Sequence, residues 1–187
     1  MGGPQQVKKR WFTVGNDIGD RTLESQTLGL APLFEVIPGK TFLDAGCAEG
    51  LISIELCKAG ALAGHGVEIV PGHVKLANKL RKEAPVTFEE GNLNSWRPKR
   101  AYDVVLALAI LHKLNRPDEV CAALAEAARE WFVFRLPSAN SPWVIRDQRT
   151  AFKPFDIGSA LDRAGFEFQQ MTLGPFEEPT GFWKRRV

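Results

Sequence analysis

The sequence is poor in the residues that bind metals or form disulfides. It has three cysteines and three histidines among 187 residues. The cysteines show no CxxC spacing and the histidines no HExxH motif, the spacings typical of redox and zinc sites. Because three cysteines cannot all pair within one chain, we expect reduced thiols, and we expect no bound metal. The residues concerned are Cys47, Cys57, Cys121, His65, His73 and His112.

Long apolar runs are also missing. The longest unbroken run, from Val104 to Leu111, is far too short to cross a bilayer. The first residues, MGGPQQVKKRW, lack the apolar stretch of a secretory signal. We therefore expect a cytoplasmic protein with no membrane contact. The length, with 44% hydrophobic and 25% charged residues, indicates one compact globular domain.

The excess of positive charge is small, since the formal net charge is only +2. A balance of this kind does not require a polyanionic partner. The basic residues are nevertheless grouped at 8–10, 97–100 and 184–186, each group beside a tryptophan. Such groups bind RNA through phosphate contacts and stacking, although solvated charge beside core aromatics is the commoner explanation. RNA therefore remains a possible partner.

Strand-like and helix-like segments alternate from residue 41 onward, which predicts a parallel sheet with helices on both faces. The last two strand-like segments are joined by a loop too short for a crossover helix, so they should be antiparallel. The expected fold class is α/β, a Rossmann-like, mostly parallel sheet of seven strands whose last strand is reversed. We expect strands at 41–45, 63–68, 85–89, 102–107, 131–136, 166–172 and 181–187, and helices at 49–59, 72–83, 117–129 and 155–164.

A glycine-containing turn follows the first of these strands. Gly46 and Gly50 fall between a strand and a helix, where backbone is able to approach a ligand closely. In open parallel sheets, ligands sit at the carboxyl ends of the strands. Asp44 lies at the end of the first strand and Glu68 at the end of the second. A carboxylate in the position of Glu68 is suited to accept the hydroxyl hydrogens of a ribose, which predicts a nucleoside-type ligand.

The residues of this turn narrow the choice of ligand. The segment GCAEGLIS lacks the lysine and the spacing of a phosphate-binding GxxxxGK[ST] loop, and its glycines do not follow GxGxxG. Asp44 and Glu49 would repel a pyrophosphate, and they suit a cationic ligand. S-adenosylmethionine carries a ribose, an ammonium and a sulfonium but no phosphate. The charge pattern therefore favours S-adenosylmethionine.

Five segments of the chain occur in the same order as the motifs of a known family: LDAGCAEG, GHGVEIV, FEEGNL, YDVVLALAILHKL and GFWKRR. They resemble, in turn, the glycine motif, the ribose-binding acid, the adenine contact, the fourth strand with its loop and the reversed last strand of class I S-adenosylmethionine-dependent methyltransferases. The resemblance runs from Thr41 to the C-terminus. The residues that it places at the cofactor are Asp44, Gly46, Cys47, Ala48, Glu49, Gly50, Glu68, Ile69, Asn92, Leu93, Ala107 and Leu108.

Two positions depart from the family pattern. Ala48 replaces the second glycine of the motif, and its small side chain should still allow a ligand to approach. Asn92 replaces the usual acid after the third strand, and its amide oxygen is able to accept a hydrogen bond from the adenine amino group. Adenine selectivity would then rest partly on the neighbouring Leu93.

An added segment precedes the sheet. Residues 1–20 mix charge, glycine and isolated aromatics, and from Thr22 one helix is expected, ended by Pro38-Gly39. We expect residues 1–40 to form an arm and helix that cover the cofactor site, with residues 41–187 as the methyltransferase domain. Arg21 and Gln26, placed on that helix, are candidates to hold the cofactor; an exposed helix arginine is an equally good interpretation of Arg21.

The resemblance implies transfer of a methyl group in line from the sulfonium to a nucleophile. His112, after the fourth strand, is the candidate to contact the acceptor or take its proton, although a lone histidine in an apolar loop more often packs. The compact chain favours a small-molecule acceptor. An RNA-directed methyltransferase and a non-catalytic S-adenosylmethionine-binding protein are the alternatives. The sequence leaves the acceptor atom and the oligomeric state open.

Overall fold

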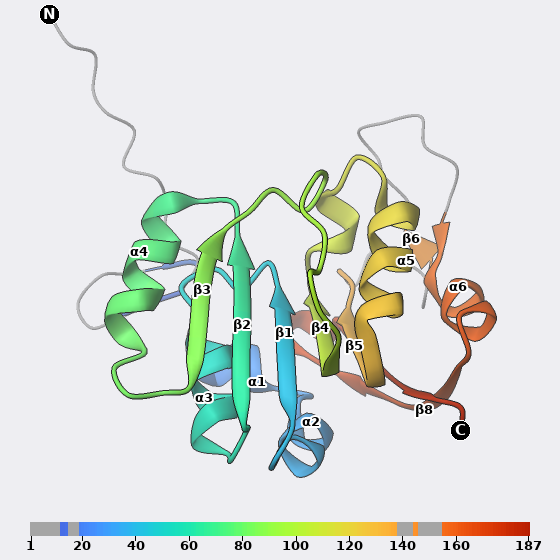
Figure 1. Cartoon of the computed structure of the whole chain (residues 1–187), viewed down its shortest axis with the longest axis horizontal. Coiled ribbons are helices and arrows are strands. Elements are labelled where there is room, and N and C mark those ends of the chain that lie inside the picture. The colour runs from blue at the N-terminus through green and yellow to red at the C-terminus, as the bar shows by residue number, and fades with distance from the viewer. Residues whose placement is uncertain (1–11, 15–18, 138–143, 146–154) are drawn as a thin grey trace, which may run out of the picture.

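The computed structural model describes residues 12–14, 19–137, 144–145 and 155–187. Its strands are β1 (Thr41–Ala45), β2 (Ala63–Glu68), β3 (Val86–Glu90), β4 (Tyr102–Leu108), β5 (Ala128–Arg135), β6 (Val144–Ile145), β7 (Phe155–Asp156), β8 (Phe166–Leu173) and β9 (Pro179–Arg185). Seven of them form one sheet in the order β3-β2-β1-β4-β5-β9-β8 (Figure 1). β1 to β5 pair in parallel, and β9 is antiparallel to both β5 and β8. The predicted mostly parallel sheet with a reversed last strand is confirmed.

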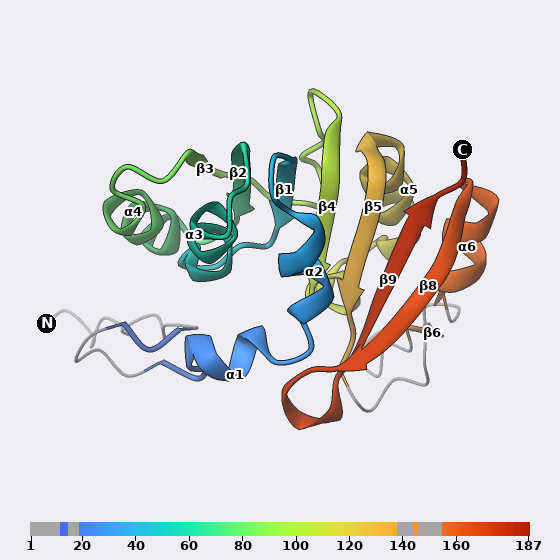
Figure 2. The same ribbon diagram turned by 90° about the horizontal axis from the view of Figure 1, so that it is seen from below.

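Helices cover both faces of this sheet, as the sequence predicted. Figure 2 shows α1 to α4 on one face and α5 and α6 on the other. Two single turns of 3-10 helix, η1 (Leu111–Lys113) and η2 (Pro175–Glu177), follow β4 and β8. The helices are α1 (Leu23–Thr27), α2 (Ala31–Val36), α3 (Leu51–Lys58), α4 (Pro71–Leu80), α5 (Pro117–Ala127) and α6 (Ile157–Arg163).

The central strands are buried on both faces. Phe42 and Val104 pack into the apolar cluster beneath α2 and α3, while their neighbours Leu43 and Val105 pack into the cluster beneath α5 and α6. All four side chains are fully buried. Because successive side chains of a strand point to opposite faces, burial on both sides explains why these strands are continuously apolar.

The expected single N-terminal helix is wrong, because two short helices occupy its place. α1 begins with Thr22 as its cap, whose hydroxyl accepts from the Ser25 amide. Gly29 then has a φ of +74°, and a Cβ there would lie 2.6 Å from the Leu173 carbonyl oxygen. Helical backbone cannot pass through that conformation, and Pro32 lies in the first turn of α2, where a missing N–H is tolerated.

Smaller differences lie near the C-terminal third. The helix expected from residue 155 begins at Ile157, because Phe155–Asp156 forms β7 and pairs with β6. The helix expected to reach residue 129 ends at Ala127, because β5 begins at Ala128.

The basic group at residues 8–10 and much of the expected arm lie outside the described residues. Within the described ranges, no helix has the length and apolarity needed to cross a bilayer.

Candidate functional site

The turn between β1 and α3 brings backbone to the carboxyl edge of the sheet. Gly46 and Gly50 have φ values of +85° and +74°, in the left-handed region that favours glycine. A Cβ on Gly46 would lie 2.8 Å from Ile110 Cγ1, and one on Gly50 would lie 2.5 Å from Phe88 Cζ. Any other residue at either position would therefore strain the backbone and displace a neighbour. Both glycines are needed for this turn.

Ala48 also has a positive φ, +49°, at the position where the family motif has a glycine. A left-handed conformation costs an L-residue about 1–2 kcal/mol. We therefore expect Ala48→Gly to raise the free energy of unfolding by roughly 0.5–1 kcal/mol, after the entropy that glycine gains in the unfolded chain. Urea unfolding measures this change. Ala45→Gly, within β1, is the control and should lower the free energy; equal losses at both positions would rule out strain at Ala48.

Asp44 is buried at the end of β1, with 3% of its surface exposed. Its Oδ2 accepts a 2.6 Å hydrogen bond from the Ser53 hydroxyl of α3. Burial raises the pKa of Asp44 to about 6, and the nearby charge of Glu68 adds to this rise. The hydrogen bond from Ser53 acts in the opposite direction and lowers the pKa. A cation bound beside Asp44 would favour its ionised form.

Glu68 ends β2 and holds the same turn from the other side. Its Oε2 accepts from the Ala48 amide at 3.1 Å, and its Oε1 accepts from the Val70 amide at 2.9 Å. Each carboxylate oxygen keeps a further lone pair. Glu68 is therefore able to accept hydroxyl hydrogens of a ligand while it still supports the turn.

His73, for which no role was predicted, lies between Glu49 and Glu68. It is in the first turn of α4, five residues after Glu68, and this spacing is the signal that could have found it. His73 Nε2 is 3.4 Å from Glu49 Oε1, and His73 Nδ1 is 4.0 Å from Glu68 Oε1. Glu49 is fully buried, and its Oε2 accepts from the Phe12 amide at 3.1 Å. His73 thus places α4 against the turn, while neither ring nitrogen forms a hydrogen bond among the described residues.

Two adjoining cavities open beside Glu68, of about 220 Å³ and 160 Å³. They share walls and together form one cleft at the carboxyl ends of β1, β2 and β4. Both are lined by Gly46, Glu68, Ile69, Ile110 and Lys113. The first is also lined by Ala48, Val70, His73, Leu108 and Ala109, and the second by Val67, Gly91, Asn92, Leu93, Asn94 and Leu114.

The N-terminal segment closes a small cavity that adjoins the cleft, since Gly46, Ala48 and Leu108 line both. Phe12 and Gln26 line it together with Asp44 and Cys47. Gln26 is buried, and its Nε2 finds no acceptor among the described residues. Burial, with the charges of Asp44 and Glu68, raises the pKa of the Cys47 thiol well above its usual value, so this thiol is unreactive.

Arg21 lies outside the helix that was predicted to carry it. It precedes α1 and forms a strand bridge with Phe12. Its Nη2 is 3.7 Å from Glu178 Oε1, and its guanidinium lies 4.3 Å from the centre of the Phe176 ring. Arg21 therefore faces the turn between β8 and β9.

Three other predicted residues lie differently from what their motifs imply. Ala107 is fully buried in the core cluster under α5 and does not line the cleft. Asn92 lines the cleft, but its Oδ1 accepts from both the amide and the side-chain nitrogen of Asn94. Among the described residues of η1, Lys113 rather than His112 lines the two cavities.

A cluster of cations around Glu178 was not predicted. Arg135 is fully buried at the end of β5 and donates to Thr180 Oγ1 and to the carbonyl oxygens of Gln26 and Leu28. Burial raises the pKa of Glu178, although Arg135, Arg21 and Lys113 all act to lower it. The members of this cluster are far apart in the sequence, so no local sequence pattern predicts that they meet.

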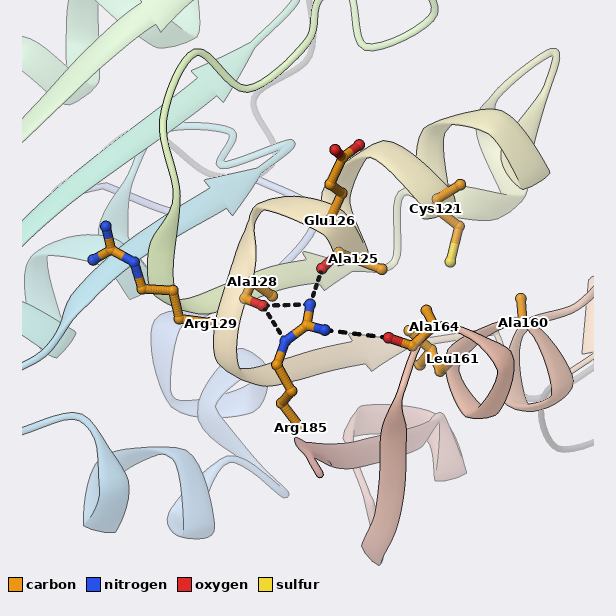
Figure 3. A pocket seen from close by; sticks show the side chains of 10 residues that line it. Cys121, Ala125, Glu126, Ala128, Arg129, Ala160, Leu161, Ala164 and Arg185 are labelled. Carbon is orange, nitrogen blue, oxygen red and sulfur yellow. Dashed lines mark hydrogen bonds between the residues drawn. The ribbon is translucent and has the colours of Figure 1, made fainter. Parts of the chain in front are cut away.

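A larger cavity, of about 570 Å³, lies away from this cleft, between α5 and α6 at the amino end of β5. Figure 3 shows the Arg185 guanidinium donating to the carbonyl oxygens of Ala125, Ala128 and Ala164. Burial raises the pKa of Cys121, also on this wall, to about 12. Arg185 thus satisfies carbonyls at the C-terminal ends of two helices, a structural role.

Comparison with known proteins agrees with this fold. Residues 42–130 match the family model of a methyltransferase domain. The magnesium protoporphyrin IX methyltransferase of Synechocystis PCC 6803, solved with bound SAH, superposes with a TM-score of 0.66 over 83% of this chain and 78% of that one, at 22% identity. The predicted resemblance to class I S-adenosylmethionine-dependent methyltransferases is confirmed.

Curated relatives match over part of their length. A ubiquinone biosynthesis O-methyltransferase of Photorhabdus laumondii is 27% identical over 113 residues, 57% of this chain and 47% of that protein. A ribosomal protein L11 methyltransferase of Thiobacillus denitrificans is 30% identical over 128 residues, 57% of this chain and 42% of that protein. The chain thus spans less than half the length of these relatives.

Proposed function

We propose that the protein is an S-adenosylmethionine-dependent methyltransferase that acts on a small-molecule acceptor. The observation that carries this proposal is the meeting of two buried carboxylates, Asp44 and Glu68, at a glycine turn that opens into a cleft. Relatives whose names specify ubiquinone biosynthesis support a small acceptor. The name of the ribosomal protein L11 relative supports a macromolecular one, which is the second candidate.

The residues of the cleft, with Asp44 of the small cavity that adjoins it, fit the parts of this cofactor. Glu68 offers carboxylate lone pairs to the ribose hydroxyls, and Asp44 offers a buried negative charge to the ammonium. Ile69 and Leu93 supply apolar walls for the adenine. When bound, S-adenosylmethionine supplies an activated methyl group. The protein then contributes mainly alignment, which by itself removes a large part of the barrier to a reaction between two molecules.

The N-terminal segment is assigned the role of a cover over the cofactor. The Phe12 amide bonds to Glu49 of the turn, and Gln26 lies beside Asp44 and Gly46 with an unpartnered Nε2 among the described residues. An unpartnered buried polar nitrogen is costly unless a ligand accepts from it. We assign that nitrogen to the cofactor carboxylate. Arg21, which faces Glu178, is the weaker candidate for this contact.

Glu68→Gln is expected to weaken S-adenosylmethionine binding by about 10–100-fold, because it removes the charge from hydrogen bonds to the ribose. Isothermal titration calorimetry measures the dissociation constant. Glu90→Gln is the matched control, since Glu90 is exposed at the end of β3 in register with Glu68. Equal S-adenosylmethionine affinities for the two variants would show that Glu68 does not bind the cofactor.

A methyl-transfer screen separates the candidate functions. The protein and S-adenosylmethionine are incubated with a pool of metabolites, with ribosomal proteins or with RNA, and release of S-adenosylhomocysteine is measured. Release with the metabolite pool supports the proposal, and release only with ribosomal proteins or RNA supports the second candidate. Cofactor binding without release from any of the three pools would indicate a binding protein.

The C-terminal basic group is a weak candidate for an RNA surface. Arg185 and Arg186 make internal hydrogen bonds to Ala128 and Asp162.

A further inference from the structure

The charged residues around the cleft form two groups. Asp44, Glu49 and Glu68 gather at the glycine turn, which is assigned to the cofactor. Lys113, Arg21 and Arg135 form the second group, and all three act on the carboxylate of Glu178. Lys113 brings this second group to the cleft, and we call the part of the cleft next to Lys113 its basic side. The basic side is where an acceptor would lie.

Lys113 is the cation that reaches the cleft itself. It follows β4 and lines both cavities together with Glu68. Desolvation lowers the pKa of Lys113, and the positive charge of Arg21 lowers it further. The negative charges of Glu68 and Glu178 act in the opposite direction and raise it. Lys113 is nevertheless an exposed residue, so an anion in the cleft is able to reach its ammonium and to stabilise the charged form.

The remaining members of the cluster keep the local charge positive. The side chain of Glu178 is 11% exposed and that of Arg21 is 20% exposed, and their 3.7 Å contact pairs these two charges. Arg135 is fully buried and donates to backbone and hydroxyl acceptors, so it adds positive charge without offering a surface to a ligand. Glu68 also acts on Lys113, so these described charges are three cations and two acids.

An apolar rim adjoins these cations. Phe176, 70% exposed, lies under the Arg21 guanidinium. Leu28 and Leu173 are also exposed, and they are brought together where Thr172 Oγ1 donates to the Gly29 carbonyl oxygen. Phe176 and Glu177 have φ values of +56° and +58°, a strained backbone of the kind that persists at ligand sites.

We propose that the methyl acceptor is an anionic molecule with an apolar body, whose acidic group is bound by the Lys113 ammonium at the basic side of the cleft. The inference rests on the proposed function, because it names the acceptor class of that same site. A carboxylate and a phosphate monoester share the required chemistry. Phe176 and the two leucines contact the apolar body of this acceptor.

Benzoate and phenyl phosphate serve as probes for the two anionic chemistries, with benzyl alcohol as the neutral probe of similar shape. They are titrated into ¹⁵N-labelled protein saturated with S-adenosylhomocysteine, so that the cofactor carboxylate already occupies its own contact. At least one anionic probe is expected to bind about tenfold more tightly than benzyl alcohol. Its chemical-shift changes should centre on Lys113 and the η2 turn. The stronger of the two anionic probes identifies the acidic group.

Three variants test the assignment to Lys113. Lys113→Met should remove the tenfold preference for the anion, and Lys113→Arg should retain it. Lys99→Met is the control, because Lys99 is exposed on the loop between β3 and β4, outside the cleft, and should leave the preference unchanged. S-adenosylhomocysteine affinity is measured first for each variant, because Lys113 also lines the cavities assigned to the cofactor. Each probe titration is then run at an S-adenosylhomocysteine concentration that saturates that variant.

Equal binding of benzoate, phenyl phosphate and benzyl alcohol would overturn the inference, and so would an anion preference that survives Lys113→Met. The absence of any binding by the three probes at equal, high concentrations counts against it in the same way. These outcomes leave the proposed function standing when S-adenosylhomocysteine binds normally. Failure of the wild-type protein to bind S-adenosylhomocysteine is a separate result, and it would contradict the proposed function.

Discussion

Replacing Arg135 with methionine is expected to lower the free energy of unfolding by about 3–5 kcal/mol. Arg135 is fully buried, and burial lowers its pKa to about 10, against the charge of Glu178. Its loss leaves Thr180 Oγ1 and the carbonyl oxygens of Gln26 and Leu28 without this donor, and leaves Glu178 with less positive charge nearby. The side chain joins the N-terminal segment to the sheet, so that segment should open first.

Urea unfolding measures the free energy, and hydrogen exchange of the amides at residues 23–30 reports the opening of the segment. Arg135→Lys keeps the charge but has one nitrogen for three acceptors, so an intermediate loss is expected. Arg129→Met is the control, because its 3.6 Å contact with Asp103 is exposed and worth less than about 1 kcal/mol. A loss of the same small size for Arg135→Met would show that the buried guanidinium does not hold the segment.

Asp44→Asn is expected to stabilise the protein near neutral pH while it weakens cofactor binding. Burial raises the pKa of Asp44 from 3.8 to about 6 in the folded protein. The cost of holding this carboxylate ionised is absent below pH 3.8, grows as pH rises through that value, and is complete above pH 6. The pH-dependent part amounts to about 3 kcal/mol, and a poorly paired asparagine amide offsets some of the gain.

The measurement is the free energy of unfolding of wild type and Asp44→Asn across this pH range. The difference should move in favour of the variant as pH rises to about 6 and then level off. Asp118→Asn, exposed in the first turn of α5, is the control and should show no such rise. A constant difference between wild type and Asp44→Asn would contradict the raised pKa. Stabilisation together with lost affinity identifies a residue kept for binding at the expense of stability.

The sequence was sufficient to predict the sheet and the glycine turn, because both depend on local patterns. Continuous apolar strands alternate with helices, and Gly46 and Gly50 sit where only positive φ closes the turn. The positions of Asp44 and Glu68 at the cleft follow directly from strand ends, since parallel strands finish at the same edge. For these features, the spacing of residues along the chain is enough to predict the three-dimensional arrangement.

Other features depend on contacts between distant segments and could not be predicted. Lys113, Arg135 and Glu178 meet only because β9 inserts between β5 and β8. The choice of Lys113 over its neighbour His112 is set by the single turn η1, whose direction the sequence does not reveal. Asn92 has a suitable amide oxygen, but its hydrogen bonds with Asn94 are visible only in three dimensions.

The central claim is that the cleft beside Asp44 and Glu68 binds S-adenosylmethionine. Calorimetric titration of the intact protein with S-adenosylmethionine, with ATP and NAD as comparison ligands, tests it most directly. The acidic turn predicts saturable one-to-one binding of S-adenosylmethionine and no binding of the two phosphate-bearing nucleotides. Binding of ATP or NAD without binding of S-adenosylmethionine, or no binding of any of the three, would contradict it.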